Sequence, residues 1–193
     1  MASRDYHVSS TGLADVALDL LESWVQQTAT ELAPPLPLWA DASLLLLHTL
    51  GMTRPSPPPP EAGSAAQSAE DKLQRLVSSM WSSGGLLSTS QQQRALDVSL
   101  RLLPHLHAWA AAWTAPPSPS TVLSTPDNAA FAVVQLLACL TMQHDKALHV
   151  LHSQGLQQLL SLPGAALSPR LERPLMALAR RVLEDPATLQ VLW

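Results

Sequence analysis

The chain has 193 residues and a net charge of −4 at pH 7, and only 13% of its residues are charged. With few charges and no basic excess, we expect no face that neutralises a phosphate backbone, so the composition disfavours nucleic-acid binding. A single cysteine rules out an intramolecular disulfide and a cysteine-based zinc site, which fits a reducing compartment.

The sequence shows neither an export signal nor a membrane span. Its first residues, MASRDYHVSS, lack the apolar core of a signal peptide. No apolar run is long enough to cross a bilayer, because the leucines at 44–47 lie between Asp41 and His48. We therefore expect a cytoplasmic and/or nuclear protein whose partners are proteins, with no membrane or nucleic-acid contact.

Residues 11–51 form the first predicted helical pair. Residues 11–31 place apolar side chains at helical spacing with acidic residues opposite, which predicts an amphipathic helix. The apolar positions of this helix are Leu13, Val16, Ala17, Leu20, Leu21, Trp24 and Val25. The second helix, from residue 37 or 38 to residue 50, is apolar on nearly every side, as expected of an inner helix, and Gly51 is predicted to end it.

Two proline- and serine-rich inserts divide the chain. Residues 52–68 include four consecutive prolines at 57–60, a composition typical of an extended, disordered linker. A docking site for an SH3 or WW partner is the alternative to a plain spacer. Residues 114–121 form the second insert, again predicted to be a disordered loop.

The middle helices are predicted within residues 69–113. A helix over 69–82 is broken by the glycines at 84–85. Ser90 is predicted to cap the next helix, which reaches Pro104, where we expect a kink or a short restart before residues 105–113.

Residues 122–193 read as a helical repeat followed by C-terminal helices. Thr125 and Pro126 start one helix, and His144 starts a second, which Gly155 is expected to end in a left-handed conformation. A short helix follows over 156–162. Helices separated by such short breaks cannot each bury an apolar side alone, so the unit is expected to stack on neighbours in a solenoid. A helix then starts at Ser168-Pro169, and another at Asp185-Pro186 runs to Trp193.

The order of three segments in this region resembles a known family. These segments are SQGL at 153–156, LLSLP at 159–163 and, after a variable loop, RRVLEDPATLQ at 180–190. They resemble the long helical region before the catalytic end of the giant HECT-type E3 ubiquitin ligases, the plant UPL and animal Mule class. The segments LPLW at 36–39 and GLL at 85–87 agree with the resemblance, which covers about residues 31–190. The chain departs from the family in its proline- and alanine-rich inserts and in stopping at Trp193, where relatives continue.

The resemblance implies an all-α, armadillo-like α-solenoid segment that serves as a non-catalytic scaffold and presents a protein-binding surface in ubiquitination. Whether the chain belongs to an enzyme depends on a catalytic domain that it does not contain, so we expect it to be inactive alone. A stand-alone α-solenoid adaptor unrelated to ubiquitin is the alternative, and a truncated remnant with no independent role is a third.

We expect no catalytic, cofactor-binding or metal-binding residue. Cys139 lies on an apolar helix with no basic group at helical spacing to lower its pKa, which predicts a buried, inert thiol. The resemblance implies that the ubiquitin-carrying cysteine lies in a separate catalytic domain. His149 and His152 share a helix face near His144, but a third and fourth metal ligand are missing nearby, so capping or solvent-facing roles are the default.

Charged and apolar residues near the C-terminus complete the sequence-based expectations. Arg180 and Arg181 are predicted to pair with the dipole of their own helix and with Glu184 or Asp185. The residues LQVLW at 189–193 are apolar and no following repeat covers them, so we expect the isolated chain to self-associate through them.

Overall fold

The computed structural model of the chain describes residues 2–28, 36–53, 85–112 and 125–183. Within these ranges the secondary structure is helical and contains no β-strand, which confirms the predicted all-α class. The α-helices are α1 (Ala2–Thr28), α2 (Leu38–Met52), α4 (Thr89–Ala112), α5 (Pro126–Leu140), α6 (His144–His152), α7 (Gly155–Leu160) and α8 (Pro169–Leu183), and a short 3-10 helix, η1 (Gly164–Ala166), precedes α8.

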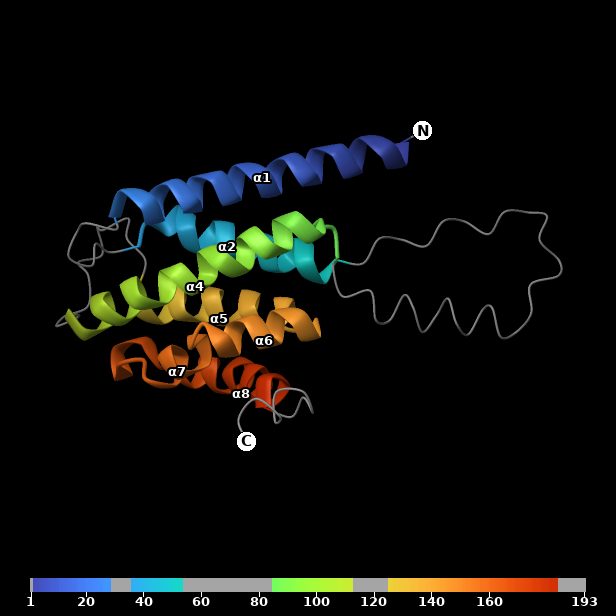
Figure 1. Cartoon of the computed structure of the whole chain (residues 1–193). Coiled ribbons are helices and arrows are strands. Elements are labelled where there is room, and N and C mark those ends of the chain that lie inside the picture. Colours follow the sequence, from blue (N-terminus) through green and yellow to red (C-terminus); the bar gives the residue numbers. More distant parts are fainter. Residues whose placement is uncertain (1, 29–35, 54–84, 113–124, 184–193) are drawn as a thin grey trace, which may run out of the picture.

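The helices lie side by side, from α1 along one edge of the molecule to α7 and α8 along the opposite edge (Figure 1). Helix α1 packs on α2 and α4, and α6 packs on α7 and α8. Helix α5 lies in the middle and packs on α2, α4, α8 and η1. Its buried residues are Pro126, Ala129, Ala130, Ala132, Val133, Val134, Leu136, Leu137, Ala138, Cys139 and Leu140.

The start of α5 is the one predicted from the sequence. The Thr125 hydroxyl accepts a hydrogen bond from the backbone N–H of Asn128 at 3.3 Å, and Pro126 occupies the first helical position. Proline is tolerated there because its missing N–H would have had no partner. The predicted starts of α6 at His144 and of α8 after Ser168 are also confirmed.

Helix α4 starts at a different cap from the predicted one, and it continues through Pro104, where a kink or a short restart was expected. Ser88, not Ser90, caps it: the Ser88 hydroxyl accepts from the Gln91 backbone N–H at 3.2 Å, and the Ser88 N–H donates to Gln91 Oε1 at 3.0 Å. This reciprocal pair is a capping box. The helix then runs through Pro104 without a restart. A proline inside a helix destabilises the helix by about 3 kcal/mol. The burial of the leucines on both sides of Pro104, namely Leu102, Leu103 and Leu106, offsets this destabilisation.

Helix α2 does not end at Gly51, as predicted, but continues one residue further to Met52. A Cβ atom at residue 51 would lie only 2.9 Å from the Cys139 sulfur, so the glycine is explained by a close helix crossing. The left-handed glycine lies at Gly85, with a φ of 53°, where the chain returns to α2. There the Leu86 N–H donates to the Leu50 carbonyl at 2.8 Å.

Helix α1 begins nine residues earlier than predicted, at Ala2 rather than residue 11, and ends at Thr28. Its packing face also differs, because Ala14, Leu18 and other small or apolar residues face the core while part of the predicted stripe is exposed. The predicted helices at 69–82 and 185–193 and the insert at 114–121 lie outside the described residues, as does all but the first two residues of the insert at 52–68.

Candidate functional site

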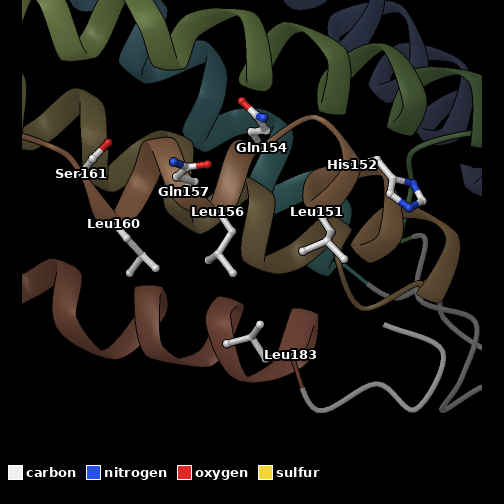
Figure 2. Close-up of a pocket in the computed structure, with 8 residues that line it drawn as sticks. All are labelled: Leu151, His152, Gln154, Leu156, Gln157, Leu160, Ser161 and Leu183. Carbon is white, nitrogen blue, oxygen red and sulfur yellow. The ribbon is translucent and has the colours of Figure 1, made fainter. Parts of the chain in front are cut away.

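An apolar groove lies between α7 and α8, beside the end of α6. It has a volume of about 730 Å³ and is lined by Leu151, His152, Gln154, Leu156, Gln157, Leu160, Ser161 and Leu183. Figure 2 shows Leu151, Leu156 and Leu160 pointing toward α8, from which Leu183 extends toward them. Leu160 and Leu183 are 58% and 40% exposed, so the groove is open to solvent.

The turn between α6 and α7 sets one wall of this groove. Gln154, with a φ of 58°, adopts the left-handed conformation that was predicted for Gly155. Gly155 instead starts α7, and a Cβ atom there would lie 2.6 Å from Leu100 Cδ2 and 3.2 Å from the Val150 carbonyl oxygen. The prediction was wrong because this glycine is required by close packing of α7 on α4. Ser161 then ends α7, its hydroxyl donating to the Gln158 carbonyl at 3.0 Å.

The three neighbouring histidines do not form a metal site. His149 Nε2 lies 3.4 Å from Asp97 Oδ1 of α4, whereas His152 lines the groove. His144 is the first residue of α6. Among the residues that the structure describes, no three histidine, cysteine, aspartate or glutamate side chains gather closely enough to hold a metal ion.

Cys139 is buried in α5, as predicted. Burial raises the pKa of its thiol, while the positive charges of Arg181 and Lys146 act in the opposite direction. No basic group was expected near this thiol, because Arg181 comes from α8 and Lys146 from α6. The burial effect is the larger one, so the thiol stays protonated and is a poor nucleophile at neutral pH.

Lys146 is an inward-facing lysine that sequence reasoning missed, with only 1% of its surface exposed. Its ammonium group donates hydrogen bonds to Gln92 Oε1 and Gln143 Oε1. The Gln143 amide also donates to Gln92 Oε1 at 2.8 Å, and the Gln92 amide donates to the Leu87 carbonyl at 2.9 Å. Burial lowers the pKa of Lys146. Gln92 belongs to α4, and Gln143 directly precedes α6. Because Gln92 and Lys146 are far apart in the sequence, no local pattern predicts their contact.

Arg181 makes a contact that was not predicted from the sequence. Its guanidinium donates a hydrogen bond to the carbonyl of Ala138 in the last turn of α5. Carbonyl groups at a helix end lack an intrahelical partner and carry the negative end of the helix dipole, so a cation is favourable there. Arg181 thus joins α8 to the C-terminal end of α5. Glu184 and Asp185, its predicted partners, lie outside the described residues.

Two sides of α1 have opposite chemistry. On one side, Arg94 of α4 pairs with Asp19 at 2.5 Å and Glu22 at 2.9 Å. On the other side, Leu13, Val16 and Leu20 are 56%, 58% and 50% exposed, although the sequence predicted that they would pack inward. Helix α2, predicted to be an inner helix, also exposes large apolar side chains, namely Leu38, Trp39, Leu45 and Met52. The exposed apolar side of α1 is a second candidate contact surface.

The comparisons with known proteins give no relative from which a site could be transferred. The chain matches no protein-family model, no curated protein and no solved structure. Within the part of the chain that the structure describes, no helix is both long and apolar enough to span a membrane.

Proposed function

We propose that the chain is a non-catalytic, armadillo-like scaffold segment of a HECT-type E3 ubiquitin ligase that presents a protein-binding surface. The observation that carries the proposal is the order of the segments SQGL, LLSLP and RRVLEDPATLQ, which resembles that family. The described parts of these segments fall on α7, on α8 and on the turns beside them.

The way the helices pack supports a scaffold role. Helices α4, α5 and α8 follow one another through direct contacts, and α6 and α7 pack beside them. Solenoids are built in this manner, each helical unit burying its apolar side on the next unit. Their surfaces suit extended protein contacts, and the open groove and the exposed side of α1 are surfaces of this kind.

The candidate residues for chemistry also support a non-catalytic role. The Cys139 thiol is buried and its pKa is raised, and the Lys146 ammonium is enclosed by amide groups. Neither group lines the groove. A nucleophile must reach its substrate and be deprotonated, so these two residues are better explained by packing than by catalysis.

A stand-alone adaptor unrelated to ubiquitin is the second candidate. The exposed apolar residues Leu13, Val16 and Leu20 favour the adaptor, because an apolar stripe on one helix can bind a partner helix without taking part in ubiquitin transfer. Sequencing the complete transcript separates the two candidates. The ligase proposal predicts a HECT catalytic domain downstream in the same reading frame, whereas a stop codon directly after the codon for Trp193 would contradict it and favour the adaptor.

A further inference from the structure

Helix α1 carries apolar side chains on two of its sides, and the fold buries one of them. The buried apolar residues of α1 are Ala14, Ala17, Leu18, Leu21 and Val25. Leu13, Val16 and Leu20 lie on the other side and are 56%, 58% and 50% exposed. Two apolar sides are typical of a helix that lies between two neighbours. Helix α1, however, runs along one edge of the molecule (Figure 1), so its second apolar side is open to a partner.

This second side has the spacing of a helix-pairing seam. Leu13, Val16 and Leu20 are followed on the same side by Ser23 and Gln27, and all five residues are exposed. The steps between them are three, four, three and four residues, which is the spacing of a heptad repeat. Its first three residues, here called the α1 stripe, supply the contacts at i, i+3 and i+7 with which helices pack on each other.

The surroundings of the α1 stripe leave room for a partner helix. A Cβ atom at Gly12, next to Leu13, would meet no atom within 4 Å. At the other end, the Gln27 amide donates a hydrogen bond to the Ser23 hydroxyl at 3.2 Å, so polar side chains limit the apolar contact there. Leu13 and Leu20 are two turns apart, about 10 Å along the helix axis. The stripe therefore offers a contact about two helical turns long.

One edge of the α1 stripe is acidic. Asp15, Asp19 and Glu22 share a side of the helix at i, i+4 and i+7. Arg94 of α4 pairs with all three, at 3.5, 2.5 and 2.9 Å. Three carboxylates thus face one guanidinium, and these four side chains keep an excess of two negative charges. The Asp19 side chain is 69% exposed and directly precedes Leu20, the position from which coiled coils form salt bridges between helices.

We propose that the α1 stripe binds an amphipathic helix of another protein, whose apolar seam is flanked by lysine or arginine. The apolar seam of such a helix covers the stripe, and its basic residues neutralise the acidic edge beside Asp19. A second copy of this chain is a poorer occupant. It would bring the same acidic edge to the contact, and the chain as a whole has a net charge of −4.

The inference deepens the proposed function, since it rests on the protein-binding role that the scaffold and the adaptor share. It assigns this binding to the α1 stripe and names the chemistry of the partner. The two proposals fail separately. Loss of the predicted helix binding would leave the expectation of a downstream HECT domain unchanged, and absence of that domain would leave the helix binding unchanged.

Selection from a displayed library of helices tests the proposal on the whole chain. The library would hold helices of about three heptads with apolar seam positions and with Lys, Arg, Asp, Glu, Gln and Ala mixed at the flanking positions. Many copies on each particle retain weak binders. Helices that bind the wild type but not Val16→Asp should be enriched in Lys and Arg at the flanking positions. The matched control is Met176→Asp on α8, a residue that is 64% exposed, and it should retain the same helices as the wild type.

Reversing the charge of the edge provides a second measurement. Asp19→Lys leaves the apolar stripe intact, so a selected basic helix should bind this variant more weakly than the wild type by roughly tenfold or more. The same helix with glutamate at its flanking positions should bind Asp19→Lys more tightly than the wild type. Fluorescence anisotropy gives both affinities, and the difference should shrink as salt is added. If Val16→Asp loses helicity, Val16→Ala keeps a strong helix former and should weaken binding in the same direction.

Two kinds of result would overturn the proposal. One is a selection that yields no helix dependent on Val16, or dependent helices enriched in acidic or uncharged flanking residues. The other is a dimer of the chain, detected by sedimentation, that Val16→Asp dissociates, because the α1 stripe would then bind a second copy.

Discussion

Replacing Gly85 by alanine tests the close contact between Gly85 and the last turn of α2. Gly85 has a φ of 53°, and a Cβ atom at this position would lie 2.2 Å from the Gly51 carbonyl oxygen and 2.3 Å from that of Leu50. Both obstacles are backbone atoms, which cannot move as a side chain can. The neighbouring Leu86 N–H donates a hydrogen bond to the Leu50 carbonyl, so a displacement of the chain away from α2 would also break that hydrogen bond.

Two separate terms contribute to the expected loss of stability. The left-handed conformation costs an alanine about 1 to 2 kcal/mol, and forcing a methyl group into an occupied space costs about 1 to 3 kcal/mol. Gly85→Ala should therefore lower the free energy of unfolding by about 2 to 5 kcal/mol. Asparagine tolerates the left-handed region, so Gly85→Asn should recover only the first term.

Urea unfolding followed by circular dichroism measures this loss, provided that the slope of the transition is unchanged. Gly12→Ala is the matched control. Gly12 lies within α1, and a Cβ atom there meets nothing within 4 Å, so the change should raise stability by up to about 1 kcal/mol. A Gly85→Ala protein within about 0.5 kcal/mol of the wild type, the usual range of surface substitutions, would refute the described contact.

Three further predictions concern packing, acid stability and thiol reactivity. Gly155→Ala should destabilise the protein through its contact with Leu100, and a double-mutant cycle with Leu100→Ala should give a coupling of about 0.5 kcal/mol or more, whereas additive effects would contradict the contact. Burial lowers the pKa values of His48 and His105 below 6.5, so the unfolded state binds protons more readily, and the free energy of unfolding should fall as the pH drops from 6.5 through the lowered values. The urea midpoints of His48→Gln and His105→Gln should decline less steeply with falling pH than the midpoint of the wild type. An equal decline would exclude these histidines as the cause. The Cys139 thiol should react with an alkylating reagent far more slowly in the folded than in the urea-unfolded protein, and equal rates would show that it is not buried.

Local chemical signals in the sequence predicted several boundaries correctly. Thr125 and Pro126 start α5 because a capping hydroxyl and a proline act within one turn of the chain. Glycines were harder to interpret, because a glycine serves a turn as well as a close contact, and Gly155 was assigned to the wrong role. A kink or a short restart was expected at Pro104, and α4 continues through it without a restart, because tertiary packing of the flanking leucines outweighs the local cost.

The candidate site was less predictable than the helices. Helical periodicity shows that a helix has an apolar side, but it does not show which part of that side a neighbour covers. The exposure of Leu13, Val16 and Leu20 therefore appeared only in the structure. The contacts of Lys146 with Gln92 join residues far apart in the chain, and the groove depends on the gap between α7 and α8. Such distances between elements have no signal in a single sequence.

Ubiquitin loading of the natural full-length protein tests the central claim most directly. The protein, isolated from its own cells as the wild type and as Cys139→Ala, would be incubated with ubiquitin, E1 and E2 and resolved without reducing agent. The proposed scaffold of a HECT-type ligase predicts a ubiquitin adduct that a reducing agent removes and that Cys139→Ala leaves unchanged, because the transferring thiol lies in another domain. Absence of any such adduct, or its loss in Cys139→Ala, would contradict the account.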